Sequence, residues 1–312
     1  MTRDQDEAMP VEAGQVRLAT CDRESPIENL YALLFAIRTF EQSLLDMFGT
    51  GVLTGTTHTC LGQEATAVGV LSALDRQRDI LFSNHRGHGH FLAYCGEIER
   101  LYLEIMGKPG GVCGGRGGSQ HLQYRNFYSN GIQGGIVPVA TGMALAEKTK
   151  GSGAITTVFL GDGTMGEGAV YESFNIASLW DLPILFVLDN NGFSQSTPFK
   201  QQVAGALRDR PEAFGIPVEE KSTTDVLEVL ALAGELSDAV RTQGRPHCLL
   251  LNTYRLGPHS RGDDDRDPAE IKAAWEDDPI ALTRRSLDTK RAGEIEAEVE
   301  GQVTEAKESA LA

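Results

Sequence analysis

The chain has 312 residues, and its 28 Lys or Arg and 44 Asp or Glu residues give a formal net charge of −16. This acidic balance argues against nucleic acid as a partner, and the longest apolar runs are far shorter than the ~20 residues that a membrane span needs. The five cysteines are scattered without a Cys-x-x-Cys pair, which favours reduced thiols in the cytoplasm over a zinc site.

The first half of the chain predicts helices and loops around one short strand. Residues 1–25 are polar and acidic, unlike a signal or transit peptide, and we expect them to be disordered or loosely attached. Residues 26–312 are expected to form a single domain with a charged helical extension at its end. Helices are expected at 27–48, 64–74 and 138–148, a strand at 80–83, and a glycine-rich loop at 108–118.

Two apolar runs in the middle of the chain predict neighbouring strands of a parallel sheet. Residues 154–160 and 183–188 are apolar or β-branched, as in strands buried on both faces. The apolar residues between them that recur at helical spacing are Val170, Phe174, Ala177 and Leu179 or Trp180. A strand, a helix and a strand of this length form a right-handed crossover. We therefore expect an α/β fold with a mostly parallel sheet and helices on both faces.

The remainder of the chain carries fewer signals. Residues 194–217 are expected to be irregular, 226–241 helical and 248–251 a strand. Beyond Pro268 the periodicity and the charge predict a helical tail.

Polar side chains follow both central strands. Gly161-Asp162-Gly163 ends the first strand, and Asn190-Asn191 follows 26 residues later at the end of the second. Ligands of parallel sheets bind beyond the carboxyl ends of the strands, where Asp162 and Asn191 both fall. Their oxygens suit Mg²⁺ or Ca²⁺, which also take phosphate oxygens. The alternative is a helix-capping Asp and a simple Asn191-Gly192 turn.

A histidine-rich segment, residues 85–90, follows the predicted strand at 80–83. Its Arg86 can grip a phosphate bidentately, and His85 can donate to oxygens. The alternatives are a surface loop or a metal site, because three histidines lie within six residues.

Two further histidines stand alone. His58 precedes the helix expected from residue 64 and reads either as a solvated neighbour of that helix or as a site residue. His259 lies in the polar loop 254–263, which follows a strand and is either a surface turn or a mobile functional loop.

Together these motifs, which run from Leu30 to Leu282, resemble the alpha subunit of the thiamine diphosphate-dependent decarboxylating component of 2-oxo acid and acetoin dehydrogenases. The resemblance implies a thiamine diphosphate-binding fold with Mg²⁺ held by Asp162, the Asn191 side chain and the Phe193 carbonyl. It implies that the cofactor-binding residues are His85, Arg86, Gly131, Gln133, Gly161, Asp162, Gly163, Thr164 and Asn191. It also implies that His58 faces the substrate and that His259 assists acyl transfer.

The resemblance further implies a reaction and its partners. The family cleaves a carbon–carbon bond next to a carbonyl and passes the acyl group to a lipoyl arm, on a lipoyl acyltransferase core. An essential glutamate lies on a separate beta subunit in this family, so we expect an assembly of two alpha and two beta chains. The glycine-rich loop and the helix near Gly142 are expected at interfaces. His58 favours a small substrate such as pyruvate or acetoin.

Three rival functions remain open from the sequence. A heteromeric carboligase or split transketolase-like enzyme shares the 161–163 and 189–191 motifs and would transfer the fragment to an aldehyde or acyl acceptor. The second rival is a non-catalytic homologue, but such a protein would not need Asp162 and Asn191, and both residues are intact here. A Rossmann dehydrogenase needs a glycine fingerprint that closes a strand and opens a helix, which residues 110–118 do not.

Overall fold

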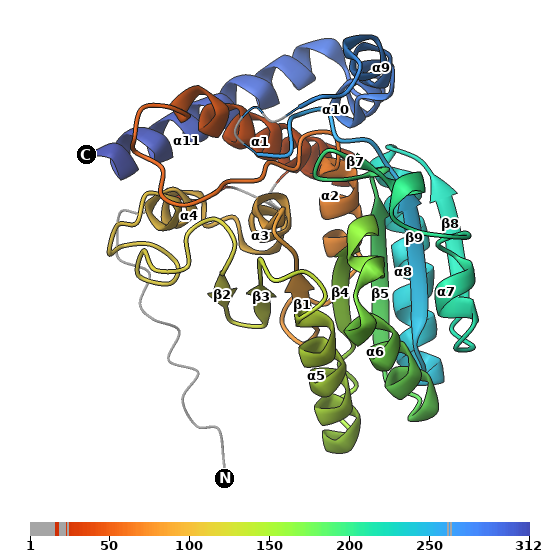
Figure 1. The fold of residues 1–312 in the computed structure, drawn as a ribbon. Coiled ribbons are helices and arrows are strands. Elements are labelled where there is room, and N and C mark those ends of the chain that lie inside the picture. The colour runs from red at the N-terminus through yellow and green to blue at the C-terminus, as the bar shows by residue number, and fades with distance from the viewer. Residues whose placement is uncertain (1–15, 19–22, 24, 261, 263) are drawn as a thin grey trace.

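A seven-stranded sheet forms the centre of the computed structural model, which describes residues 16–18, 23, 25–260, 262 and 264–312 (Figure 1). The strand order is β2-β3-β1-β4-β5-β9-β8, and every neighbouring pair is parallel except β2 with β3. The strands of this sheet are β1 (Ile80–Ser83), β2 (Gln123–Tyr124), β3 (Phe127–Ser129), β4 (Thr156–Gly161), β5 (Ile184–Asn190), β8 (Val218–Ser222) and β9 (His247–Asn252). The expected mostly parallel sheet is confirmed.

Helices cover both faces of the sheet, as expected. In Figure 1, α5 and α6 lie in front of the strands and α8 lies behind them, with α1 and α11 packed together at the top. The helices are α1 (Pro26–Met47), α2 (Glu64–Ser72), α3 (Gly87–Cys95), α4 (Ile98–Ile105), α5 (Ile136–Lys150), α6 (Gly168–Leu179), α7 (Asp209–Glu212), α8 (Val226–Gln243), α9 (Pro268–Ala274), α10 (Pro279–Arg284) and α11 (Thr289–Leu311). None of the helices in the described residues is long and apolar enough to cross a membrane.

The apolar runs of the central strands arise because both of their faces are buried. Along β5, Leu185 and Val187 belong to the apolar cluster shared with α1, α2 and α8, whereas Ile184, Phe186 and Leu188 belong to the cluster shared with α5 and α6. Successive side chains of a strand point to opposite faces, so burial on both sides requires a continuous apolar run.

Several local expectations were wrong. Residues 85–90 do not form a loop throughout, because α3 begins at Gly87 and carries His88 and His90. Leu179 and Trp180 are 70% and 48% exposed, so they do not belong to the buried stripe of α6. Residues 194–217 contain short elements, namely β6 (Phe193–Ser194), β7 (Thr197–Pro198), η2 (Phe199–Gln201) and α7.

Residues 1–25 lie mostly outside the described residues. Within them, Leu18 is buried and its backbone N–H donates to the Gly96 carbonyl at 2.9 Å. The Val16 N–H donates to the Glu99 carboxylate at 2.6 Å. This short segment therefore packs against the turn between α3 and α4.

The close approach of α2 to α8 gives a stability prediction. A Cβ on Gly69 would lie 2.6 Å from Cγ1 and 2.7 Å from Cβ of Val229, and 3.1 Å from the backbone nitrogen of Leu230 on the facing helix α8. We expect Gly69→Ala to lower the free energy of unfolding by about 1–3 kcal/mol through overpacking, as measured by urea denaturation. Gly234→Ala on α8 is the control, since its Cβ would meet nothing within 4 Å, and we expect it to be neutral or stabilising. A Gly69→Ala variant as stable as the wild type would contradict this packing.

Candidate functional site

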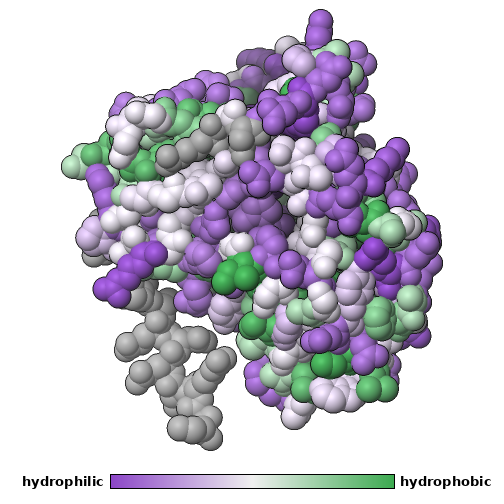
Figure 2. Space-filling view, viewed as in Figure 1, coloured by the Kyte–Doolittle hydropathy of each residue, from purple (hydrophilic) through white to green (hydrophobic). Residues whose placement is uncertain are grey.

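The predicted site residues converge at one edge of the sheet. Parallel strands end at the same edge. The predicted residues other than His58 lie at the carboxyl end of β4 or in the segments that follow β1, β3, β4, β5 and β9. Hydrophilic residues gather around a hollow at the centre of the face in Figure 2, above the tip of β1 in Figure 1. This is the position expected for a ligand of a parallel sheet.

Asp162 opens the 3-10 turn η1 (Asp162–Gly166) directly after β4, and Asn191 follows β5. Asp162 is buried, and the backbone N–H groups of Asp162 itself, Gly163 and Asn191 lie close to its carboxylate. Its Oδ2 atom has no hydrogen-bond partner among the described residues. Burial is the main cause that raises the pKa of Asp162 above its usual range. A cation beside Oδ2 would satisfy this atom and stabilise the ionised form.

A second buried carboxylate lies near the first. Burial, opposed by hydrogen bonds from Thr253 and Gln63 and increased by the charge of Asp162, raises the pKa of Asp189 to about 6. Thr253 Oγ1 donates to Asp189 Oδ1 at 2.6 Å. Two carboxylates in one buried place favour a divalent cation, because each ionised group otherwise opposes ionisation of the other.

The turn after β5 supplies further oxygen atoms. Asn191 Oδ1 accepts a hydrogen bond from the Phe193 N–H at 3.1 Å and keeps a second lone pair. Ser194 packs directly on η1, because a Cβ on Gly163 would lie 2.4 Å from Ser194 Oγ. Glycine at position 163 therefore allows β6 to approach the predicted metal ligands. The buried Thr164 lies on the same turn.

No group of three or more His, Cys, Asp or Glu side chains in the described part of the chain is arranged to hold a metal by itself. A cation at Asp162 would therefore depend on amide and carbonyl oxygens and on oxygens of a bound ligand. Hard oxygen ligands of this kind suit Mg²⁺ and Ca²⁺, which commonly keep water or phosphate in their shells. The donor set thus fits the predicted Mg²⁺ and diphosphate.

Three histidines from separate segments form a cluster beside this site. The ring centroid of His58 lies 4.6 Å from that of His259 and 4.8 Å from that of His85, and the centroids of His85 and His259 are 5.9 Å apart. Burial, followed by the charges of Arg86 and the other two histidines, lowers the pKa of His85 well below its usual range. Its Nδ1 atom is buried without a partner among the described residues. His85 is therefore a neutral polar group that a ligand can satisfy.

Arg86 is a buried cation at the end of β1. Its Nη1 donates to the Thr59 carbonyl at 2.6 Å, and its Nη2 lies 3.1 Å from Nδ1 of His259. Burial and then the neighbouring Arg255 lower the pKa of Arg86 to about 9, so the guanidinium stays charged at neutral pH. Among the described residues no carboxylate forms an ion pair with Arg86. A buried positive charge in this setting favours an anionic ligand.

The other two histidines of the 85–90 segment point elsewhere. His88 Nδ1 lies 3.1 Å from the Glu41 carboxylate, and its Nε2 lies 2.7 Å from Ser119 Oγ. His90 Nδ1 lies 2.7 Å from Ser83 Oγ. A metal site built from His85, His88 and His90 is therefore wrong, because the helical turn of α3 separates their side chains.

The loop after β3 brings Gly131 and Gln133 to the site. The Ile132 N–H donates to Asn130 Oδ1 at 2.7 Å, which shapes the turn. Gln133 Nε2 donates to the Asn130 carbonyl at 3.3 Å, and the Gln133 side chain lies close enough to His85 to oppose part of the fall in the His85 pKa. Gly131 lies against Gln120, since a Cβ there would be 1.9 Å from Gln120 Oε1. Sequence reasoning missed Gln120, because nothing in its local pattern indicates that it reaches this loop.

Sequence reasoning also missed Arg266, which clamps the loop that carries His259. Its Nη1 and Nη2 donate to the carbonyls of Arg255 and Gly257 at 2.5 Å and 2.7 Å. The guanidinium also lies over the rings of Tyr254, at 4.9 Å, and Phe193, at 5.6 Å. Arg266 therefore ties the loop after β9 to the turn that holds the predicted metal ligands. Arg261 and Asp263 of the predicted 254–263 loop lie outside the described residues.

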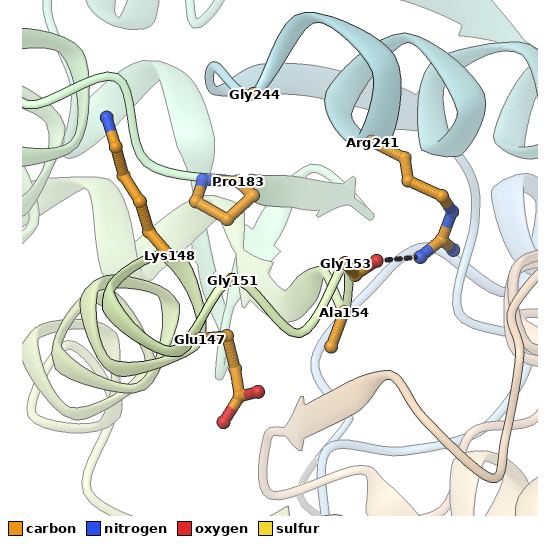
Figure 3. Close-up of a pocket in the computed structure, with 8 residues that line it drawn as sticks. All are labelled: Glu147, Lys148, Gly151, Gly153, Ala154, Pro183, Arg241 and Gly244. Carbon is orange, nitrogen blue, oxygen red and sulfur yellow. Dashed lines mark hydrogen bonds between the residues drawn. The ribbon is translucent and has the colours of Figure 1, made fainter.

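A small cavity of about 160 Å³ lies at the opposite edge of the sheet (Figure 3). It is bordered by Lys148, Pro183 and Arg241 among others. Arg241 donates to the Gly153 carbonyl at 2.7 Å and pairs with Asp79, and Lys148 donates to the Trp180 carbonyl at 2.7 Å. Both cations are engaged, and no predicted site residue lines this cavity.

The family comparison and the comparison with individual proteins point to the same family. The sequence profile of the family described as "Dehydrogenase E1 component" matches residues 33–312. The pyruvate dehydrogenase E1 component subunit alpha of Zymomonas mobilis is 36% identical over 287 residues, which cover 89% of this chain and 80% of that protein. Subunits alpha of acetoin:2,6-dichlorophenolindophenol oxidoreductase are 37% identical in Bacillus subtilis (75% of this chain, 71% of the relative) and in Cupriavidus necator (85% and 79%).

The Arg266 clamp gives a prediction about loop order. Arg266→Lys keeps the charge but cannot reach both carbonyls with a planar fork, so we expect amide hydrogen exchange of residues 254–260 to accelerate about tenfold, as for a loss of about 1.4 kcal/mol. Arg208→Lys is the matched control, because Arg208 lies on the surface and forms ion pairs with the Glu212 and Glu220 side chains, neither of which belongs to the 254–260 loop. Unchanged exchange in the loop, or an equal change in both variants, would refute the clamp.

Proposed function

This chain belongs to the dehydrogenase E1 component family, as its sequence motifs had indicated, and we propose that it is the alpha subunit of a thiamine diphosphate-dependent 2-oxo acid or acetoin dehydrogenase. In this role it cleaves a carbon–carbon bond next to a carbonyl and passes the acyl group to a lipoyl arm. The observation that carries the proposal is the buried, unsatisfied Oδ2 of Asp162 beside Asn191 and Asp189.

We propose that the turns after β4 and β5 bind the diphosphate end of the cofactor together with its metal ion. Asp162, the Asn191 side chain and the Phe193 carbonyl would hold Mg²⁺. Gly161, Gly163 and Thr164 form the turn on which the diphosphate would lie. When bound, thiamine diphosphate supplies an electron sink for cleavage of the bond next to the carbonyl.

The positive side of the site comes from the neighbouring segments. Arg86 and His85, after β1, and Gly131 and Gln133, after β3, would complete the surface around the cofactor. The buried Arg86 charge attracts an anion, and the neutral His85 offers a hydrogen bond without adding charge. The ring centroids of His58 and His259 lie 4.6 Å apart, and both side chains would face the substrate. We propose that His259 assists transfer of the acyl group to the lipoyl arm.

We propose that the glutamate that activates the cofactor comes from a partner chain. Glu64 of this chain is buried, pairs with Arg38 at 2.6 Å and accepts a hydrogen bond from the Gly62 N–H at 2.9 Å. Both contacts are structural, so we do not assign the activating role to Glu64. A glutamate from a beta subunit would activate the cofactor, in an assembly of two alpha and two beta chains with a lipoyl acyltransferase core. The exposed Val139 and Leu145 on α5, near Gly142, and the 108–118 loop would lie at interfaces.

We propose a cytoplasmic location, which the cysteines support. Cys60, Cys95, Cys113 and Cys248 are free thiols in the described residues, which fits a cytoplasmic enzyme.

Removal of one charge tests the metal assignment. We expect Asp162→Asn, assembled with the beta chain, to bind thiamine diphosphate in the presence of Mg²⁺ about 100-fold more weakly than the wild type, because the isosteric amide removes the anionic ligand. Isothermal titration calorimetry with and without Mg²⁺ measures this. The control is Asp181→Asn at an exposed turn after α6. Unchanged affinity in Asp162→Asn would refute the assignment.

The role of His259 is tested by separating two steps. We expect His259→Ala to lower the rate of lipoyl acylation about 100-fold while release of CO₂ from pyruvate, or of acetaldehyde from acetoin, falls much less. The exposed His121→Ala serves as control. Equal losses in both steps would contradict the role, and product transfer to an aldehyde in place of lipoate would support the carboligase.

A further inference from the structure

Gln120 connects the loop around Gly131 with the predicted substrate-facing histidine. Its Nε2 lies 3.0 Å from Nδ1 of His58 and 3.2 Å from the carbonyl oxygen of Thr56. Its Oε1 lies over Gly131, where a Cβ would be 1.9 Å away. One side chain thus contacts two predicted site residues without being one of them.

The orientation of the Gln120 amide is fixed by its neighbours. The Thr56 carbonyl can only accept a hydrogen bond, so the amide atom that faces it must be the nitrogen. The same nitrogen has a second hydrogen, which is the one that points to His58. If the amide oxygen and nitrogen of Gln120 were exchanged, the amide oxygen would lie 3.2 Å from the Thr56 carbonyl oxygen, and neither atom could donate a hydrogen bond.

The backbone that carries Gln120 is also held. Ser119 is buried, and its Oγ lies 2.7 Å from Nε2 of His88, which in turn contacts Glu41 at 3.1 Å. Ser129 Oγ donates to the Gln120 carbonyl at 2.9 Å. These contacts fix the backbone from which the Gln120 side chain reaches His58.

A donor at Nδ1 decides the tautomer of an imidazole. A neutral histidine has one nitrogen that donates and one that accepts, so an Nδ1 that accepts from Gln120 leaves the proton on Nε2. The same relation holds at His259, whose Nδ1 lies 3.1 Å from Nη2 of Arg86, a group that can only donate. Two histidines of the cluster are therefore fixed in one tautomer by independent donors.

We propose that Gln120 is a positioning residue that holds His58 as the neutral Nε2–H tautomer. His58 then offers the substrate a hydrogen-bond donor in place of a base. The matching ligand atom is an acceptor oxygen, such as the carbonyl oxygen of a 2-oxo acid or of acetoin. The assignment of the tautomer rests on the Gln120 amide, whereas its use in catalysis rests on the proposed function.

The test reads the tautomer directly and needs neither cofactor nor partner. The full chain is prepared with ¹⁵N-labelled histidine, and the ring nitrogens are observed by NMR, with the His58 signals identified by their loss in His58→Gln. We expect a pyridine-type Nδ1 and a pyrrole-type Nε2 for wild-type His58. Gln120→Met, which keeps the length but removes the donor, should give a mixture of tautomers. Gln120→Glu, which places an acceptor there, should shift the proton to Nδ1.

Gln123→Glu is the matched control, because Gln123 is an exposed glutamine three residues away whose Nε2 donates to the Arg125 carbonyl. It should leave the His58 signals as in the wild type. A pyrrole-type Nδ1 in the wild type, or a wild-type tautomer in both Gln120 variants, would overturn the proposal. Because the readout is independent of thiamine diphosphate, failure of the proposed function would not change this result, and the reverse also holds.

Discussion

The site depends on two buried carboxylates that the sheet forces together. The parallel register of β4 and β5 pairs Gly161 with Asp189, so Asp162 and Asn191 leave neighbouring strands at the same level. Burial raises the pKa values of Asp162 and Asp189, and the charge of Asp162 adds to the increase at Asp189. The charge of Arg86 opposes only part of both increases. Native proteins rarely bury such a pair without a use for it, and a divalent cation is the simplest way to stabilise both.

The other segments are arranged around this pair by main-chain contacts. The Leu256 N–H donates to the Leu61 carbonyl at 2.8 Å, and a Cβ on Gly62 would lie 2.3 Å from the Tyr254 carbonyl. The segment of His58 and the loop of His259 are thereby locked against each other. Arg86 then bridges both, because its Nη1 donates to the carbonyls of Thr59 and His259. The site thus combines two buried carboxylates with a buried guanidinium, a set of groups that suits a metal–diphosphate pair.

The sequence predicted the β4-α6-β5 unit and its polar ends because burial on both faces leaves a continuous apolar run that local inspection can read. Strand ends in a parallel sheet then follow from topology, so Asp162 and Asn191 could be paired in advance. The start of α3 at Gly87 could not, since two glycines and two histidines in that turn are poor helix formers and only tertiary packing stabilises them. The meeting of His58, His85 and His259 depends on contacts between segments as far apart as residues 58 and 259. The roles of Gln120 and Arg266 also depend on contacts between separate segments. Such contacts leave no periodic signal in the chain.

The central claim is that this chain holds the metal end of the cofactor at the carboxyl ends of β4 and β5. Anomalous diffraction from crystals of the chain with its beta subunit, thiamine diphosphate and Mn²⁺ in place of Mg²⁺ tests it most directly. The account predicts one anomalous peak within coordination distance of Asp162 Oδ2, Asn191 Oδ1 and a diphosphate oxygen. A peak at the His58, His85 and His259 cluster, or a bound cofactor with no metal at Asp162, would contradict it.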